Sequence, residues 1–305
     1  MKIVVSGSTG LIGTALKQAL RQRGADVMPL VRHPVSPGEH ALAWDPERGT
    51  IDRTGLERFG ADAVVHLAGE TVLGRWTAAK KQRVRESRVV GTRTVSDAIA
   101  GLQRPPATLL AASAVGYYGD RGDEVLGETS APGEDFLAHV ARDWEAATAA
   151  ATRAGIRVVN MRNGIVLATR GGALAKMLPP FRLGLGGTVG SGNQYFSWIA
   201  LDDIIGAILY LLDTPSLVGP VNMTAPHPVT NREFTKTLGR VLGRPTIVPV
   251  PAFALRMAFG TEGAAMLKSG QRVLPARLIA SGFRFSFSEV EPALQHLLAP
   301  SERPR

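Results

Sequence analysis

The sequence contains no cysteine. Disulfide bonds, thiolate metal ligands and cysteine nucleophiles are therefore excluded. The six histidines show no spacing that is typical of a metal site, so we expect no bound metal. The chain also has no unbroken apolar run approaching the ~20 residues that a membrane-spanning helix needs, and we expect no membrane partner.

Basic residues outnumber acidic residues and give the chain a formal net charge of +9. They are spread along the sequence, apart from a concentration of arginine and lysine between residues 75 and 93. That stretch lacks interleaved aromatic side chains and carries no DNA-binding motif, so we expect no nucleic-acid partner. The first expected strand begins at Lys2, which leaves no room for a signal peptide, and we expect a cytoplasmic protein.

The amino-terminal segment combines a strand, a glycine-rich turn and a helix. A β-branched run at 2–6 leads into the glycines, and a helical pattern follows to residue 23. In this context a glycine motif binds a dinucleotide, because the diphosphate lies against the helix N-terminus. The expected contacts come from Gly7, Ser8, Thr9, Gly10, Leu11, Ile12 and Gly13.

Strand-like and helical patterns alternate through the first two thirds of the chain. This alternation predicts an α/β protein with a doubly wound parallel sheet of the Rossmann type. From residue 171 onwards, glycine and proline interrupt the pattern, which indicates a small, mainly helical cap. The expected strands are 2–6, 26–31, 63–67, 108–112 and 157–161, and the expected helices are 11–23, 77–102 and 136–154.

The same patterns predict the division of the chain. We assign residues 1–170 to an NADP-binding domain, whose sheet is completed by parts of 197–225. Residues 171–298 form the mixed substrate and cap region, with a helix near 201–212 and a strand near 219–222. We expect the tail at 299–305 to be disordered.

The choice of cofactor is expected at the end of the second strand. An acid about 20 residues past the glycine loop would bind the ribose 2′-hydroxyl of NAD. The chain instead has Arg32 and His33 there. Because a guanidinium suits a phosphate, the sequence favours NADP(H), with NAD the less favoured alternative.

The spacing G-x-x-G-x-x-G at residues 7–13 resembles that of the extended short-chain dehydrogenase/reductase superfamily. The resemblance implies that Asp45 contacts the adenine amino group and that Ser113 is the catalytic serine of the Ser-x-x-x-Tyr-Gly segment at 113–119. Further cofactor contacts are expected from Leu67, Ala68, Gly69, Ala112 and Arg88.

The superfamily's Tyr-x-x-x-Lys pair is absent from this chain. In an alignment on Trp144-Glu145, the matching positions are Leu137 and Ala141, and residues 136–145 contain neither tyrosine nor lysine. The usual pair exchanges a proton with the substrate oxygen, so another group near Ser113 has to replace it if chemistry occurs. The candidate catalytic residues are Ser113, Tyr118, Tyr117 and Glu70.

A narrower resemblance is to the epimerase-family, atypical members of this superfamily, which have their own carboxyl-terminal domain. It covers residues 1 to about 298 and implies a Rossmann fold and NADP(H) binding, but it leaves the reaction undefined. The segments that carry it are 44–46, 66–70, 74–77, 87–93, 113–119, 171–174, 190–194, 197–199, 228–231 and 271–275.

Three hypotheses about function remain. The chain is an NADP(H)-dependent oxidoreductase on a small polar or carbonyl substrate, a non-catalytic NADP(H)-binding sensor or scaffold, or a nucleotide-sugar epimerase or dehydratase that uses NAD. The helices near 77–102 and 133–154 are a possible homodimer contact. The expected substrate contacts are Asn163, Gln194, Tyr195 and Trp198.

Overall fold

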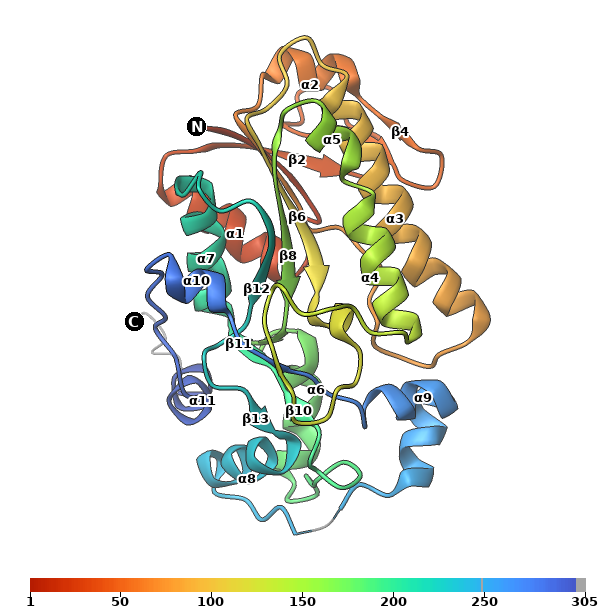
Figure 1. Cartoon of the computed structure of the whole chain (residues 1–305), viewed down its shortest axis with the longest axis vertical. Coiled ribbons are helices and arrows are strands. Elements are labelled where there is room, and N and C mark those ends of the chain that lie inside the picture. The colour runs from red at the N-terminus through yellow and green to blue at the C-terminus, as the bar shows by residue number, and fades with distance from the viewer. Residues whose placement is uncertain (248, 300–305) are drawn as a thin grey trace.

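The computed structural model describes residues 1–247 and 249–299 and shows a large parallel sheet between two layers of helices (Figure 1). The sheet has eight strands in the order β12-β8-β6-β5-β1-β2-β3-β4, and only the β3–β4 pair within it is antiparallel. Its strands are β1 (Lys2–Ser6), β2 (Asp26–Val31), β3 (Leu42–Asp45), β4 (Thr50–Ile51), β5 (Ala63–His66), β6 (Thr108–Ala114), β8 (Arg157–Asn163) and β12 (Gly219–Met223).

Helices cover both faces of this sheet, as expected for parallel strands that are buried on both sides. Leu16 of α1 and Ile204 of α7 pack on one face, and Val95 of α3 packs on the other. The helices of the two layers are α1 (Leu11–Gln22), α7 (Leu201–Asp213) and α10 (Ala276–Ala280) on one side, and α2 (Arg53–Phe59), α3 (Ala78–Ala100), α4 (Phe136–Ala146) and α5 (Ala149–Arg153) on the other. The predicted Rossmann-type fold is confirmed.

A smaller lobe lies at the carboxyl ends of the strands and has its own apolar core around Phe181, Trp198 and Phe234 (Figure 1). Its elements are β9 (Ile165–Leu167), α6 (Gly172–Arg182), β10 (Tyr195–Phe196), β11 (Trp198–Ala200), β13 (Val229–Thr230), α8 (Asn231–Leu242), α9 (Ala252–Met266) and α11 (Val290–Leu298). Between the lobes lie η1 (Val115–Tyr118) and the pair β7 (Val125–Leu126) and β14 (Arg272–Val273).

The helical pattern at 136–154 corresponds to two helices in the structure, and the single helix predicted there is wrong. The helix α4 ends at Ala146, and Thr148 interrupts the pattern by donating its hydroxyl proton to the Glu145 carbonyl. The backbone N–H of Ala151 is taken by the Ser96 hydroxyl of α3 at 3.0 Å. A contact with α3 therefore accompanies the break, and local helix propensity does not show such a contact.

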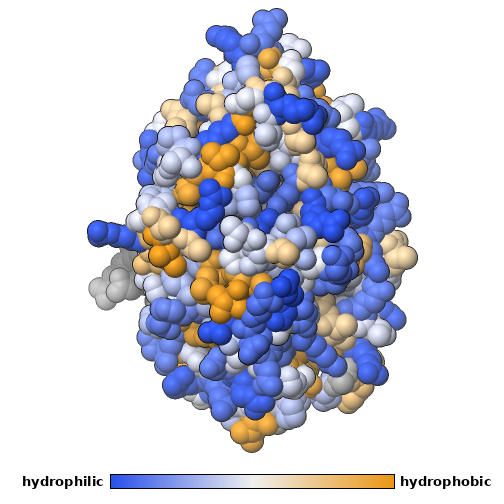
Figure 2. Space-filling model, viewed as in Figure 1, coloured by the Kyte–Doolittle hydropathy of each residue, from blue (hydrophilic) through white to orange (hydrophobic). Residues whose placement is uncertain are grey.

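The surface is mainly polar on the face shown in Figure 2. Hydrophilic residues cover most of the face in Figure 2, with apolar residues in small groups between them. In the part of the chain that is described, no helix has the length and apolar character to span a membrane. Of the tail predicted at 299–305 to be disordered, all residues after Ala299 lie outside the described residues.

Candidate functional site

The glycine turn after β1 forms a tight cradle. Gly7 has a φ of +65°, and a Cβ there would lie 2.8 Å from the backbone nitrogen of Ala68. A Cβ on Gly13 would lie 2.2 Å from the Gly7 carbonyl oxygen, so α1 packs directly on the turn. Only glycine fits these two positions, because the neighbouring atoms are backbone and cannot move aside.

The first turn of α1 is open to an anion. Its N-cap residue is Gly10, which has no side chain to cap the helix, and the first turn contains no acidic residue. The free N–H groups and the helix dipole favour negative charge at this end, so the cradle fits a diphosphate.

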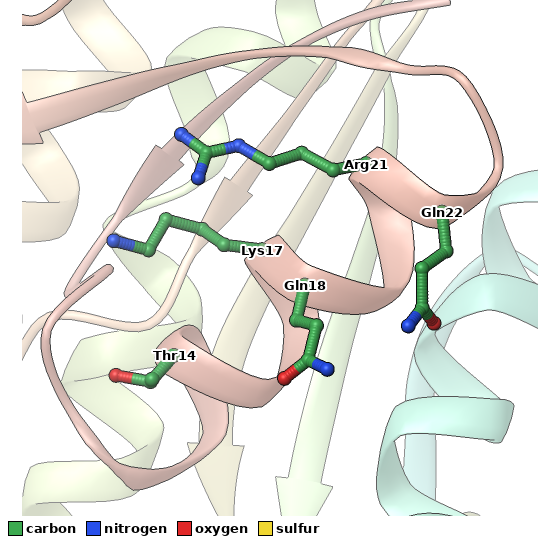
Figure 3. A pocket seen from close by; sticks show the side chains of 5 residues that line it. All are labelled: Thr14, Lys17, Gln18, Arg21 and Gln22. Carbon is green, nitrogen blue, oxygen red and sulfur yellow. The ribbon is translucent and has the colours of Figure 1, made fainter.

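Two basic side chains of α1 extend to the same side of the helix. Figure 3 shows Lys17 and Arg21 pointing to the same side as Thr14, while Gln18 and Gln22 point elsewhere. These five residues line an open hollow of ≈ 510 Å³ on the outer face of the helix. The hollow brings together no catalytic side chains, and Arg21 belongs to the last turn of α1, at the end away from the cradle.

A second hollow lies at the ends of β2 and β3. It measures ≈ 360 Å³ and is lined by Arg32, His33, Pro34, Ala43, Trp44, Asp45, Thr50, Ile51 and Asp52. Arg32 is exposed and has no ion-pair partner within 1–247 and 249–299. Asp45 accepts the backbone N–H groups of Glu47 and Arg48, so its carboxylate also closes the β3–β4 turn. The structure thus brings Arg32, His33 and Asp45 to one hollow, where a 2′-phosphate and an adenine would fit.

Ser6 and His66 fix the turn beside the cradle. The Ser6 hydroxyl lies 2.7 Å from Nδ1 of His66 and accepts the backbone N–H of Leu67 at 3.1 Å. His66 is completely buried, and burial lowers its pKa from 6.5 to about 4. His66 is therefore a neutral structural residue that holds the predicted cofactor contacts at 67–69 against Gly7.

His66 makes stability depend on pH. Because its pKa is depressed on folding, the unfolded chain binds the additional proton below pH 6.5, and stability falls as the pH drops toward 4. Between pH 7 and pH 5 we expect this residue to cost ~2 kcal/mol of unfolding free energy. Urea unfolding of wild type and His66→Gln at both pH values checks this, because the amide cannot take up the proton.

His40 supplies the control for that measurement. It is exposed, and its ring lies 3.1 Å from Asp26. A His40→Gln variant should show the same acid-induced loss of stability as the wild type. Equal losses in wild type and His66→Gln would contradict the assignment.

Glu70 pairs with α3 rather than with Ser113. Its carboxylate lies 2.6 Å from Nζ of Lys80, and the hydrogen bond from that lysine lowers the pKa of Glu70. A carboxylate stabilised in this way is a poor proton donor at neutral pH. The catalytic role of Glu70 remains a prediction, but its carboxylate is already paired with Lys80.

Arg88 braces the same turn from α3. Its guanidinium donates to the carbonyls of Glu70 and Val84 and lies 4.9 Å from the Trp144 ring centroid. Burial lowers the pKa of Arg88 to about 10, so it stays charged at neutral pH. Arg88 therefore supports the backbone at 69–70, which the cofactor was predicted to approach. A direct contact between Arg88 and the cofactor remains a prediction.

A buried polar network holds Ser113 at the carboxyl end of β6. The Ser113 hydroxyl donates to Glu145 of α4 at 2.7 Å. Arg162 of β8 forms a bidentate pair with that carboxylate, with Nε–Oε1 and Nη2–Oε2 distances of 2.7 and 2.9 Å. Burial alone would lower the pKa of Arg162, but the hydrogen bonds and charge of Glu145 outweigh it and raise the pKa. The pair is therefore ionised and orients the serine.

The two tyrosines after β6 belong to the same network. Tyr118 is fully buried, accepts a hydrogen bond from Arg162 at 2.9 Å and donates to Asn222 at 2.7 Å. Burial raises the pKa of Tyr118. The ring of Tyr117 is half-buried and stacks on Arg162, with 3.5 Å between the guanidinium carbon and the ring centroid. The hydroxyl of Tyr118 is thus buried and already hydrogen-bonded to Arg162 and Asn222, and Tyr117 is the more accessible of the two tyrosines.

The positions of the missing pair contain no polar group in the structure either. Leu137 is half-buried, and its Cβ lies 3.5 Å from where a Cβ on Gly116 would be. Ala141 is a buried residue of α4. These apolar side chains occupy the positions at which the superfamily carries its proton donor and lysine.

The predicted substrate residues have different surroundings. Asn163, at the end of β8, has a buried Oδ1 without a hydrogen-bond partner among the described residues, so it can receive a donor from a ligand. Gln194 donates to the carbonyls of Val189 and Leu267 and holds two loops together. Tyr195 is half-buried beside Arg272, with 5.1 Å between the guanidinium carbon and the ring centroid.

Trp198 requires a correction. Its side chain is fully buried in the core of the smaller lobe, and its indole N–H donates to the His227 carbonyl. It packs there with Phe181 and Phe234 as a core residue. Large aromatic side chains are often core residues, and the alternation along β11 gave no sign of which face it occupies.

The sequence prediction missed Arg162, Glu145 and Asn222 as site residues. Arg162 did carry a signal, because it is a charge within the otherwise buried strand 157–163. The part of the chain that is described contains no cluster of three or more metal-ligating side chains of the histidine, cysteine, aspartate or glutamate kind.

The fold and the cradle define a dinucleotide-binding α/β protein of the Rossmann type. Residues 3–223 match the model of the NAD dependent epimerase/dehydratase family, and residues 250–297 match a domain of unknown function (DUF1731). The chain belongs to this epimerase/dehydratase family.

Relatives cover nearly the whole chain. The epimerase family protein Mb2239 of Mycobacterium bovis is 44% identical over 293 residues, which are 96% of each chain. The epimerase family protein SDR39U1 of Bos taurus is 41% identical over 304 residues, covering 98% of this chain and 100% of that protein. A crystal structure of human SDR39U1 (isoform 2) with NADPH has a TM-score of 0.87 at 36% identity and covers 97% of this chain and 99% of its own.

Proposed function

We propose that the protein is an NADP(H)-dependent oxidoreductase that acts on a small polar hydroxy or carbonyl substrate at Ser113. The open α1 N-terminus would hold the diphosphate, and Arg32 with His33 would meet the 2′-phosphate. Human SDR39U1 was crystallised with NADPH, which supports this choice of cofactor. When bound, NADP(H) supplies hydride transfer to or from the substrate carbon.

The observation that carries the proposal is the hydrogen bond from Ser113 to the Glu145–Arg162 pair. Because the serine proton points to Glu145, the Oγ lone pairs remain for a substrate hydroxyl. Ser113 Oγ would accept a hydrogen bond from the substrate hydroxyl and so hold the reacting carbon in place for hydride transfer.

A non-catalytic NADP(H)-binding protein is the second candidate. It is favoured by the apolar Leu137 and Ala141 and by the enclosed hydroxyl of Tyr118. In that case the Ser113 network would be a structural element of the nucleotide-binding fold, and Ser113 could be replaced without loss of any activity.

The test measures reduction of NADP⁺ by the full chain with a panel of small alcohols and hydroxy acids, and oxidation of NADPH with the corresponding carbonyls. We expect turnover that Ser113→Ala lowers by ~100-fold or more while nucleotide affinity stays unchanged. Ser216→Ala, at an exposed serine of the loop between α7 and β12, serves as the control. Unchanged turnover in Ser113→Ala would overturn the proposed role, and NADP(H) binding without turnover would favour the second candidate.

Arg32 should decide between the two nicotinamide cofactors. We expect Arg32→Ala to weaken NADPH binding by ~10- to 100-fold and to leave NADH binding nearly unchanged, because only NADPH carries the 2′-phosphate. Calorimetric titration of wild type and variant with NADPH, NADP⁺, NADH and NAD⁺ measures this. Equal weakening of NADPH and NADH would contradict the assignment of the 2′-phosphate site.

A further inference from the structure

The backbone around Arg272 is held on several sides. Val273 donates its backbone N–H to the Ser197 hydroxyl at 3.0 Å, and that hydroxyl donates to the Gln271 carbonyl. One residue further on, the Leu274 carbonyl accepts a hydrogen bond from Asn222 at 2.9 Å. Because β14 is also paired to β7, the backbone position from which the Arg272 side chain extends is fixed before any ligand binds.

The strand also fixes the direction of that side chain. Val273 is buried in a cluster with Tyr118, and Tyr117 packs against this cluster. Because successive side chains of a strand point to opposite faces, Arg272 points away from the cluster. The guanidinium of Arg272 lies against the ring of Tyr195. The backbone of Tyr195 packs closely on Gly270, because a Cβ added to Gly270 would lie 2.3 Å from the Tyr195 carbonyl oxygen.

The guanidinium of Arg272 has unused donors. The side chain is half-buried, yet it has no hydrogen-bond or ion-pair partner within residues 1–247 and 249–299. Arg162, by contrast, is paired with Glu145 and Tyr118. A positioned, partly desolvated guanidinium without an acid is a ready receptor for a carboxylate or a phosphate, because its planar fork can bind two oxygens.

Contacts connect the strand that carries this arginine, through Val273, to the catalytic candidate. Tyr117 touches the β14 cluster on one side and stacks on Arg162 on the other. Arg162 in turn pairs with the carboxylate that holds Ser113. A short chain of packed side chains therefore links the strand that carries Arg272 to Ser113 at the carboxyl edge of the sheet.

We propose that Arg272, seated on the Tyr195 ring, binds an anionic group of the substrate, so that the substrate is a small hydroxy or oxo compound bearing a carboxylate or phosphate. This inference rests on the proposed function. Tyr195 supports the guanidinium through a cation–π contact, and Arg272 supplies the hydrogen bonds to the anion.

The test titrates the full chain, saturated with NADP⁺ so that the cradle and the Arg32 site are filled, with inorganic phosphate and with malonate in a calorimeter. We expect saturable binding of at least one anion, weakened ~10-fold or more in Arg272→Gln. Arg272→Lys should retain part of the affinity, since it keeps the charge but not the fork. Tyr195→Phe should bind as the wild type does, because it keeps the ring, whereas Tyr195→Leu should bind several-fold more weakly.

Arg284→Gln is the matched control, because it removes one exposed positive charge from another part of the carboxyl-terminal region. Its anion affinity should equal that of the wild type, and all variants should bind NADP⁺ equally. No anion binding by the wild type, or equal binding by wild type and Arg272→Gln, would overturn the inference. Arg272-dependent anion binding without turnover would instead overturn the proposed function and leave the anion site standing.

Discussion

A Gly10→Val variant is expected to lose NADP(H) affinity by ~100-fold or more while it keeps its fold. Gly10 lies at the N-cap of α1 with φ −74° and ψ 176°, a conformation that any residue adopts. A Cβ there would approach only the Gly7 carbonyl oxygen, at 3.3 Å, so we expect a stability cost of ~1 kcal/mol. The added side chain fills the space in which the diphosphate would contact the helix N-terminus. Calorimetric titration with NADPH and urea unfolding measure the two effects.

Two other glycines separate binding from stability. In Gly13→Ala the new Cβ would meet the Gly7 carbonyl at 2.2 Å, so both the fold and nucleotide binding should suffer. Gly127 has open space around it, and Gly127→Val should change neither property. Retained NADPH affinity in Gly10→Val would show that the diphosphate lies elsewhere.

An Arg162→Met variant is expected to lose ~3–5 kcal/mol of unfolding free energy. The substitution leaves the Glu145 carboxylate without its bidentate partner, and it removes the donor to the Tyr118 hydroxyl. Only 3% of the Arg162 side chain and 13% of the Glu145 side chain are exposed, so water cannot replace these contacts. Urea unfolding at neutral pH measures the loss.

The double variant Glu145→Leu/Arg162→Met tests the cause of that loss. Because it removes the unpaired charge as well, we expect it to be more stable than Arg162→Met by ~1–2 kcal/mol. Arg142→Met removes an exposed arginine of α4 and should change stability by less than ~0.5 kcal/mol. If Arg162→Met were as stable as the wild type, the network would not be the rigid support of Ser113 that the distances indicate.

The fold could be predicted from local sequence patterns because each pattern reports a short-range constraint. Strands β1 and β2 have the predicted bounds, since short β-branched and apolar runs bounded by glycine and polar residues favour strands that are buried in a parallel sheet. The short elements β3, β4 and α2 between residues 42 and 59 were not predicted. They depend on packing against Trp44 and Leu56 in the core, which periodicity over so few residues does not reveal.

The nucleotide cradle was determined by the sequence itself, because its parts are neighbours in the chain. Gly7, Gly10 and Gly13 lie within one turn and the first residues of one helix, so their arrangement is mainly local, although the backbone at 67–68 also closes on Gly7. Arg32 is the residue immediately after β2, so its position at the end of that strand is also a local feature of the sequence. A sequence is informative wherever the geometry is local.

The surroundings of Ser113 were decided only by the tertiary structure. Ser113 and Glu145 are 32 positions apart, and Tyr118 and Asn222 are 104 positions apart. No periodicity connects such residues, and the same residue types are usually solvated or packed singly. The parallel sheet brings the ends of β6, β8 and β12 to one edge, and burial there forces their polar groups to satisfy one another. Trp198 was misassigned for the complementary reason, because the core of the smaller lobe forms only when α6, α8 and α11 pack around it.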